Sequence, residues 1–399
     1  MSGFYLYDDS VARGFEPFAL SRPVGELRAG ALLIRERWER ALGIPCAGFL
    51  GAPHLADFDE EGAPGAAPAG KLPMGAVVVN ARFAPVLTPA LAVDVWRSTT
   101  RVAALRIMRA IKAEEFSDDV RPLDSLFMPT ARMGDVEGWW MDAPWDLVRH
   151  LPDMLARDIE ALSAEVPSVA PDGVTVLGEH PVTIEPGATV EPMVLIDATA
   201  GPVLIRTGAR VAAFSRLVGP LYVAAHAQVA GGKVACSAVG EHSRVHGEIS
   251  NAIFVGYANK GHDGFLGHSV LGRWVNLGAS TVTSNLKNTY GPVQLWTPDG
   301  VKDTGLQFLG TLFGDHAKTA IGTRLTTGCV VGTGANVVGS GLTPKVIAPF
   351  SWGEGDALYD VAKFALVAER MMTRRGVTLG DRGRLHLARV FAARWRTSA

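Results

Sequence analysis

The sequence predicts a chain in which an α/β domain precedes a parallel β-helix, and helices close the C-terminal end. Over residues 1–144, short apolar runs mix with helical segments, which is an α/β pattern. Over residues 174–355, apolar residues recur every six positions, as the coils of a β-helix require. We therefore divide the chain into an α/β domain at 1–144, a helical linker at 145–173, a β-helix at 174–355 and a helical segment at 356–399.

The N-terminal domain is expected to contain buried strands and at least one helix. Phe4–Tyr7 and Ala76–Val79 are apolar runs of strand length, and residues 31–42 have helical periodicity. Residues 145–166 predict one amphipathic helix that links the two domains, because apolar side chains recur at spacings of three or four. These side chains are Leu147, Leu151, Leu155, Ile159 and Leu162.

In the repeat region, each six-residue unit predicts one short strand and a turn. One apolar side chain per unit enters a stacked core, and glycines or small residues form the corners. Turn sequences between residues 289 and 308 predict a loop that projects from the solenoid. From residue 356, a helix with Leu358 and Val361 on one side would cover the last coil, which otherwise exposes strand edges. The repeat positions include Ile205, Val211, Leu217, Val223, Val229, Phe265, Leu271, Leu277, Leu325, Val331 and Val337.

Composition narrows the possible functions. A chain of 399 residues with 48% hydrophobic residues can bury two cores. The formal net charge of −2 argues against a nucleic-acid surface and gives no reason to expect membrane attachment. Cys46, Cys236 and Cys329 are far apart and form no CxxC pair, which argues against a disulfide framework or a structural zinc site. The N-terminus lacks a signal-peptide pattern, so we expect a cytoplasmic protein with no membrane partner.

Polar side chains that carry chemistry gather within the repeat between residues 253 and 290. The cluster contains Asn259–Asp263, Asn276 and Ser284–Asn288. A histidine can remove the proton of an attacking amine, and an amide or backbone N–H can stabilise the oxyanion of a tetrahedral intermediate. The cluster is therefore typical of acyl transfer to an amine.

These residues also carry a resemblance to a known family. The motifs GHDGFLG, LGRWVNLGAST and SNLKN resemble the acetyltransferase half of the GlmU-like bifunctional family, which makes UDP-N-acetylglucosamine. Over almost its whole length the chain is similar to a variant bacterial branch of sugar nucleotidyltransferases in that family. The ordered blocks are LYDD, RPVGELRAG, IRERW, NKGHDGFLGHS, WVNLGAS, SNLKN, FGDHAKT and PFSWG. The resemblance implies a nucleotidyltransferase-like N-terminal domain, a left-handed parallel β-helix and a homotrimer with active sites between neighbouring prisms.

The resemblance also assigns roles to single residues. His262 matches the family's catalytic base, with His268 as the competing imidazole, and Asn276 matches an asparagine at the sugar site. Phe265 stands where the family commonly has tyrosine, and Ser250 with its neighbour stands where an active-site lysine is expected. The remaining candidates are Lys260, Asn285 and Lys287 for the substrate, and Ala279 and Lys318 for acetyl-CoA. Histidines at other hexapeptide corners, His226, His242 and His246, are interpreted as turn or surface residues.

The N-terminal motif departs from that of a typical nucleotidyltransferase. Such enzymes hold a triphosphate with a glycine-rich loop and cations after the first strand. Asp8 and Asp9 stand at this place and are candidates for Mg²⁺. Arg22 and Arg28 are candidates for the phosphates, but they could equally pair with carboxylates, so nucleotidyl transfer stays open at this point.

The favoured hypothesis is an acetyl-CoA-dependent N-acetyltransferase acting on an amino sugar phosphate such as glucosamine 1-phosphate. Nucleotidyl transfer with Mg²⁺ would couple this step to the formation of a UDP-sugar for the cell envelope. One alternative is a sugar-1-phosphate nucleotidyltransferase whose β-helix is structural or regulatory. Another is a non-catalytic trimeric scaffold or sugar-nucleotide sensor. The sequence leaves the sugar, the acyl donor and the nucleotide base open.

Overall fold

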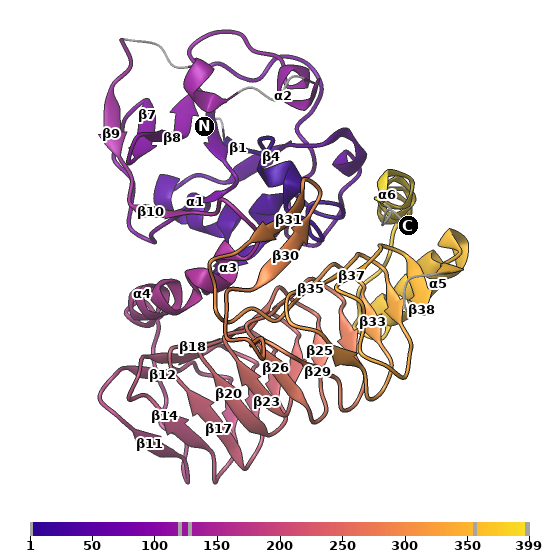
Figure 1. Cartoon of the computed structure of the whole chain (residues 1–399). Coiled ribbons are helices and arrows are strands. Elements are labelled where there is room, and N and C mark those ends of the chain that lie inside the picture. The colour runs from indigo at the N-terminus through magenta and orange to yellow at the C-terminus, as the bar shows by residue number, and fades with distance from the viewer. Residues whose placement is uncertain (1–2, 119–121, 127–129, 354–356, 396–399) are drawn as a thin grey trace.

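The predicted fold class is confirmed by the computed structural model, which describes residues 3–118, 122–126, 130–353 and 357–395. An α/β domain lies against one flank of a long parallel β-helix, and two helices follow at the C-terminal end (Figure 1). The predicted division into domains and linker stays our proposal. No helix among the described residues is both long enough and apolar enough to cross a membrane.

The N-terminal domain is organised around a six-stranded sheet with β1 (Phe4–Tyr7) inside a parallel trio. All four residues of β1 are buried, which explains a continuous apolar run instead of an alternating one. The remaining three strands include antiparallel pairs, so the sheet is mixed. From one edge to the other, the strands beside β1 are β4 (Cys46–Leu50), β5 (Val77–Asn80), β8 (Arg101–Arg106), β7 (Val95–Ser98) and β9 (Met133–Asp135).

Helix α1 (Ile34–Leu42) buries Trp38 completely, and the indole Nε1 donates to the Phe83 carbonyl at 3.0 Å. The helix ends at Gly43, whose φ of +66° forms the left-handed cap that glycine adopts readily. Smaller elements complete the domain: β2 (Arg28–Ala29), β3 (Leu32–Leu33), β6 (Phe83–Pro85), β10 (Gly138–Trp140), α2 (Glu114–Asp118) and 3-10 turns at Ala12–Gly14, Val24–Glu26, Pro53–Leu55 and Leu123–Leu126.

The linker contains two helices, α3 (Asp146–Arg149) and α4 (Leu151–Ser163), where the sequence predicted one. Pro152 stands in the first turn of α4 and lacks the N–H that a continuous helix would need from it. The apolar face of α4 is buried in a core that also contains Leu204 and Tyr222 of the β-helix. The linker is therefore packed between the two domains and does not act as a free arm.

A buried ion pair fixes α4 to the N-terminal domain. The Arg37 guanidinium binds the Asp158 carboxylate at 2.8 Å, and the two side chains are 0% and 1% exposed. Asp158 also accepts from the Ala31 backbone N–H at 2.9 Å. Burial raises the pKa of Asp158 to about 6, although the charge of Arg37 opposes this shift. Loss of either partner would leave an uncompensated charge in the interior.

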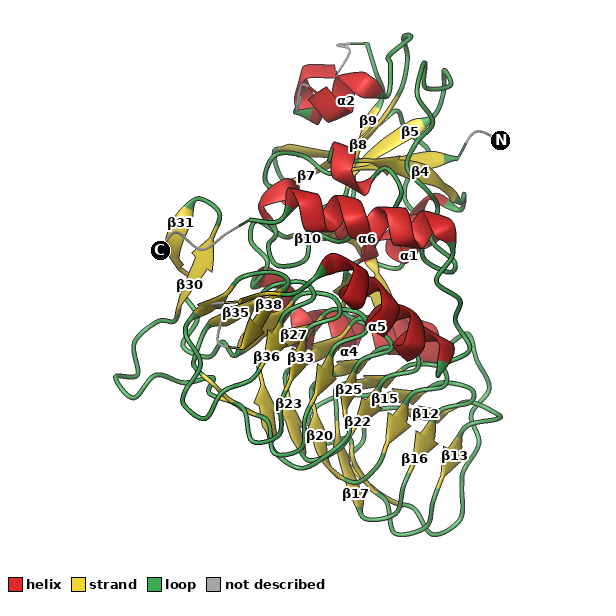
Figure 2. Ribbon diagram, turned by 90° about the vertical axis from the view of Figure 1, so that its right-hand side faces the viewer, coloured by secondary structure: helices red, strands yellow, loops and turns green. Residues whose placement is uncertain are grey.

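The β-helix is a three-sided prism of parallel sheets, and each coil adds one short strand to each side (Figure 2). Face 1 contains β11 (Thr175–Leu177), β14 (Leu195–Asp197), β17 (Ser215–Val218), β20 (Gly232–Ala235), β23 (Glu248–Ser250) and β26 (Phe265–Gly267). Face 2 contains β12 (Val182–Ile184), β15 (Val203–Ile205), β18 (Leu221–Val223), β21 (Ala238–Val239), β24 (Ile253–Phe254), β27 (Val270–Leu271), β32 (Thr311–Phe313), β35 (Cys329–Val331) and β37 (Val346–Ile347).

Face 3 is the longest side of the prism. It contains β13 (Thr189–Val190), β16 (Arg210–Val211), β19 (Gln228–Val229), β22 (Arg244–Val245), β25 (Asn259–Lys260), β28 (Asn276–Leu277), β33 (Lys318–Thr319), β36 (Asn336–Val337), β38 (Ser351–Gly353) and β39 (Ala357–Leu358). A further parallel pair joins β29 (Val282–Thr283) to β34 (Arg324–Leu325). On each two-residue strand from β16 to β36, the second residue is buried in the prism, and most of these residues are apolar.

The projecting loop expected after residue 289 is a β-hairpin formed by β30 (Gln294–Thr297) and β31 (Gly300–Asp303). It rises from the prism beside the N-terminal domain (Figure 1). The C-terminal helices are α5 (Val361–Thr373), which lies across the prism, and α6 (Asp381–Ala393), which lies between α5 and the N-terminal domain (Figure 2). Leu358 belongs to β39 and not to the predicted helix, because β39 pairs antiparallel with β38 before α5 begins.

Two buried arginines of the N-terminal domain bind carboxylates of the β-helix. Arg22 binds Asp315 at 2.9 Å, and Arg28 binds Glu241 at 2.5 Å. Each guanidinium is at most 1% exposed. Because these pairs cross between the domains, the two halves of the chain share charged contacts as well as an apolar core.

We expect Asp158→Asn to destabilise the protein by about 3–5 kcal/mol, since the change leaves Arg37 buried without its counter-ion. On the same helix, Arg157 binds Glu137 with both side chains more than half exposed. Arg157→Ala should therefore cost no more than about 1 kcal/mol. Urea unfolding followed by circular dichroism measures both changes. Equal effects of the two substitutions would contradict a dominant role for the buried pair.

Candidate functional site

Asp8 follows the central strand β1 at the carboxyl edge of the parallel trio, where open α/β sheets bind ligands. The side chain is 4% exposed, and its carboxylate accepts from the Val24 N–H at 3.3 Å. Burial raises the pKa of Asp8 to about 7, and the neighbouring Asp9 adds to this shift. Gly51 leaves room beside the carboxylate, because a Cβ there would lie 3.3 Å from Asp8 Oδ2.

Asp9 is committed to other protein groups. Arg82 donates to its carboxylate from Nη2 at 2.8 Å, Asn80 donates at 2.9 Å and the Ala12 N–H donates at 2.9 Å. Although burial opposes ionisation, the hydrogen bonds and charge of Arg82 lower the pKa of Asp9. The sequence analysis did not select Asn80 or Arg82. Asn80 is the last residue of β5 and Arg82 comes shortly after it, much as Asp8 and Asp9 come after β1.

The N-terminal carboxylates fit Mg²⁺ only through Asp8. Asp9 would have to release Arg82, whereas Asp8 has spare acceptor capacity beside the space at Gly51. The described residues contain no group of three His, Cys, Asp or Glu side chains that could hold a metal. Mg²⁺ commonly takes one carboxylate together with substrate phosphates and water, and the arrangement at Asp8 is compatible with that mode.

Arg22 and Arg28 do not face an open phosphate site. Arg22 is bound by Asp315 and Glu60, and Arg28 is bound by Glu241 and the Ala31 carbonyl. A triphosphate could reach these guanidinium groups only if the contacts between the domains broke. The expected role in phosphate binding is therefore corrected to a structural one, and pairing with carboxylates was the alternative that the sequence left open.

A cavity of about 580 Å³ lies between the loop after β1 and the β30–β31 hairpin. Its lining includes Ser10 and Gly14 from the N-terminal domain, and Asp299 and Lys302 from the hairpin. Lys302 is an exposed cation beside this cavity that sequence reasoning missed. A ligand in the cavity would touch both domains.

In the β-helix, His262 stands on an enlarged corner between faces 3 and 1. The turn between β25 and β26 spans residues 261–264, which we call the His262 turn, whereas the turn one coil earlier spans only residues 246 and 247. The His262 turn therefore has four residues where the earlier turn has two. The extra length places His262 and Asp263 at the surface, and both side chains are exposed.

Lys260 lies inside the prism and holds this turn from within. The side chain is 0% exposed, and Nζ donates to the His262 carbonyl and, at 2.8 Å, to the Asp263 carbonyl. Burial lowers the pKa of Lys260 to about 8. The expectation that Lys260 binds substrate is therefore corrected: its ammonium group points into the core, at a position that is apolar in neighbouring coils. The repeat itself indicates that Lys260 points inward, because Lys260 occupies the same position in its coil as Val245 in the coil before.

Asn276 belongs to a chain of amides on the outer side of face 3. Arg375 donates to Asn259 Oδ1 at 2.6 Å, and Asn259 Nδ2 donates to Asn276 Oδ1 at 3.1 Å. This order leaves the Asn276 –NH₂ group to donate to a ligand. The next coil places Lys318 beside Asn276, and Lys318 Nζ donates to the His316 carbonyl at 3.0 Å. Burial lowers the pKa of Lys318 to about 8.

His268 lies at a different corner, between faces 1 and 2. Asn285 Nδ2 lies 2.9 Å from His268 Nδ1, and the imidazole stacks on Phe308 with ring centroids 5.3 Å apart. Burial lowers the pKa of His268 to about 4, so the ring is neutral at physiological pH. Asn285 is thereby placed at the His268 corner, away from the His262 turn.

The remaining candidates are also dispersed. Ala279 lies in the turn that follows β28, one coil beyond the His262 turn and at the same corner. Lys287 Nζ donates to the Pro292 carbonyl at 2.8 Å, at the base of the projecting hairpin. The structure therefore brings His262, Lys260 and Ala279 to one corner, and places Asn276 and Lys318 on face 3.

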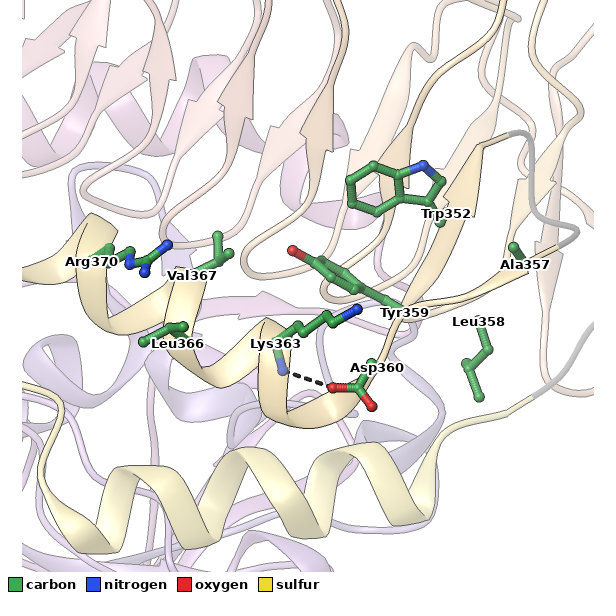
Figure 3. Close-up of a pocket in the computed structure, with 9 residues that line it drawn as sticks. All are labelled: Trp352, Ala357, Leu358, Tyr359, Asp360, Lys363, Leu366, Val367 and Arg370. Atoms are coloured by element: carbon green, nitrogen blue, oxygen red, sulfur yellow. Dashed lines mark hydrogen bonds between the residues drawn. The ribbon is translucent and has the colours of Figure 1, made fainter.

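A second cavity, of about 540 Å³, lies between the end of the prism and α5 (Figure 3). Trp352 and Tyr359 form one wall with ring centroids 5.0 Å apart, and Lys363 and Leu366 project from α5. The Lys363 backbone N–H donates to Asp360, which caps the helix. None of the candidate site residues from the sequence analysis lines this mainly apolar cavity.

Comparison with known proteins shows similarity in parts of the chain. Residues 4–166 match the family model described as sugar nucleotidyl transferase. Over 100 residues, the chain is 31% identical to a protein named "Bifunctional protein GlmU" from Methanococcus vannielii. This second match covers 25% of the chain and 24% of that relative, so the chain spans about a quarter of the length of the relative that it matches.

We expect Asp8→Asn to change the pH dependence of stability. The native pKa of Asp8 is about 7 against an ordinary value of 3.8, so the native state holds this proton more tightly than the unfolded state. The wild-type free energy of unfolding should therefore fall, by up to ~4 kcal/mol, as pH rises from about 4 to 7. Asparagine cannot ionise, so Asp8→Asn should remove this fall.

Urea titrations at pH 5 and pH 8 measure the difference. Exposed Asp299 provides a control, since Asp299→Asn should leave the wild-type pH profile unchanged. A wild-type and an Asp8→Asn profile of equal slope would contradict the assignment.

Proposed function

Because the chain joins a sugar nucleotidyl transferase domain to a parallel β-helix in the manner of the GlmU-like family, we propose a bifunctional transferase acting on a sugar phosphate. The β-helix transfers an acetyl group from acetyl-CoA to an amino sugar phosphate of the glucosamine 1-phosphate class. The N-terminal domain transfers a nucleotidyl group to the sugar 1-phosphate. The observation that carries the acyl-transfer part is the His262 turn, which presents an exposed imidazole from a backbone held by Lys260.

In this proposal, His262 accepts the proton of the attacking amine. The amine nitrogen bonds to the thioester carbonyl carbon, the C–S bond breaks, and the proton passes through the imidazole to the departing CoA sulfur. Asn276 lies in the coil after the turn, and Asn259 donates to its Oδ1 atom, which leaves the –NH₂ group to donate to a ligand. This amide is suited to donate to the sugar or to the developing oxyanion.

Nucleotidyl transfer is assigned to the carboxyl edge of β1. Asp8 would hold Mg²⁺, which neutralises charge on the nucleotide phosphates when it is bound. The protein itself supplies the fixed strand edge and the space beside Gly51. On the β-helix side, Lys302 of the hairpin is an exposed cation that lines the cavity beside the loop after β1. It is therefore suited to contact the nucleotide phosphates.

A second candidate function is nucleotidyl transfer with a β-helix that is only structural. The observation in its favour is the use of Asp315 and Glu241 of the β-helix to bind Arg22 and Arg28 of the other domain. These contacts show one role of the prism that needs no acyl transfer. A non-catalytic scaffold or sugar-nucleotide sensor would use the same contacts.

The full-length protein should be incubated with acetyl-CoA, UTP, Mg²⁺ and glucosamine 1-phosphate, and CoA and pyrophosphate release followed separately. Release of both products supports the bifunctional enzyme. Pyrophosphate release without CoA release supports the second candidate and rejects acyl transfer. Release of neither product, in protein that binds UDP-sugars, supports a sensor.

We expect His262→Ala to lower the acetylation rate by about 10²-fold to 10⁴-fold, the usual contribution of a general base. His268→Ala is the matched control, because burial lowers the pKa of His268 to about 4, which makes it a weak base, and its ring is packed against Phe308. Its loss should change the rate far less. Initial rates of CoA release measure both variants, and an equal loss in the two would reject His262 as the specific base.

We also expect a homotrimer, because the exposed His262 turn needs a neighbouring prism to complete a substrate site. Multi-angle light scattering of the full-length protein at micromolar concentration should give three times the chain mass of 42.3 kDa. A monomeric mass would argue strongly against acyl transfer at this corner.

A further inference from the structure

His246 is positioned beside the His262 turn, although the sequence suggested only a turn or surface residue. It occupies the short corner one coil before that turn, and its backbone N–H donates to the Lys260 carbonyl at 2.7 Å. Its Nδ1 atom lies 3.2 Å from Asp263 Oδ1. The imidazole also packs over Gly231, where a Cβ would approach the ring to 3.2 Å.

The two residues of the contact between His246 and Asp263 differ in their exposure to solvent. The Asp263 side chain is 84% exposed, whereas that of His246 is 29% exposed. The His246 Nδ1 atom is shielded from solvent and makes no well-aligned hydrogen bond within the described structure. The Asp263 carboxylate at 3.2 Å can therefore supply the acceptor that this nitrogen needs, and the contact restrains a carboxylate that would otherwise be free in solvent.

Two side chains therefore contact the His262 turn from opposite sides, in addition to backbone hydrogen bonds from neighbouring coils. From inside the prism, Lys260 binds the carbonyls of His262 and Asp263, which directs both side chains outward. From outside, His246 contacts the Asp263 carboxylate. The Asp263 backbone is thereby fixed by Lys260 and by the Ser280 N–H, which donates to the Asp263 carbonyl at 3.0 Å, and the Asp263 side chain is restrained by His246.

We propose that His246 is a positioning residue for acyl transfer, acting through Asp263 to fix the turn that presents His262. This inference rests on the proposed acyl-transfer function. Small misplacements of a reacting group strongly reduce rates, because the reacting atoms must be held near attack geometry. An exposed carboxylate–imidazole contact is a weak restraint, so its loss should lower kcat by about fivefold to tenfold. The KM for the sugar should stay unchanged.

The test compares His246→Gln, Asp263→Asn and the double variant in the full-length protein. Each single change should lower kcat by about fivefold to tenfold, and the double change should lower it no further, because the two residues act through one contact. Glu248→Gln is the matched control. It removes an exposed ion pair with Lys233, at 4.0 Å, from face 1 of the same coils and should leave kcat unchanged.

Hydrogen–deuterium exchange provides a readout that does not need activity. Amides of residues 261–264 should exchange faster in His246→Gln and in Asp263→Asn than in the wild type or Glu248→Gln. Absence of CoA release by the wild type would reject the proposed function, whereas faster exchange in the variants would still show the restraint. Wild-type CoA release combined with unchanged kcat and unchanged exchange in both single variants would overturn the role of His246. Multiplicative losses in the double variant would overturn it as well.

Discussion

Each short strand of the β-helix places at most two side chains in the core of the prism, and this constraint controls the rest of the structure. On face 3, Val211, Val229 and Val245 stack in register through successive coils. The next inward position is Lys260, whose ammonium group cannot stay unpaired inside the prism. The neighbouring turn is long enough to turn two carbonyls inward and bind it. The one lysine in this stretch of the column is thus bound by the turn that exposes His262.

The contact between the two domains depends on the same physical rule. Arg22, Arg28 and Arg37 are almost completely buried, and each binds a carboxylate far away in the sequence. Removal of one partner from such a pair leaves a charge in a medium of low dielectric constant. The arginines that looked available for a triphosphate are therefore structural. Asp8 and the space beside Gly51 remain at the carboxyl edge of β1. The nucleotidyl-transfer hypothesis therefore depends mainly on Asp8.

The imidazoles of the β-helix show how position in the prism separates residues of one type. His268 is buried against Phe308, and its lowered pKa keeps it neutral. His226, His242, Tyr257 and Trp274 stack on one another along a third corner, with centroids 4.3 to 5.0 Å apart. His262 and His246 lie at the corner between faces 3 and 1, where the turn length changes. The corner, and not the residue type, decides which histidine is able to meet a substrate.

The sequence by itself determined the order of the domains, the six-residue repeat, the projecting loop and the presence of polar residues within the repeat. These features follow from local periodicity and turn chemistry, which any short window of the chain contains. Tertiary structure alone decided that Arg22 and Arg28 bind Asp315 and Glu241, that α4 is shared between two cores, and that His246 meets Asp263. These partners are separated by 17 to more than 200 positions, and a long-range ion pair leaves no periodic signal in the sequence. The inward direction of Lys260 depends on both. The repeat places Lys260 at an inward position, but this position is recognised only from its pairing with Val245 in the structure.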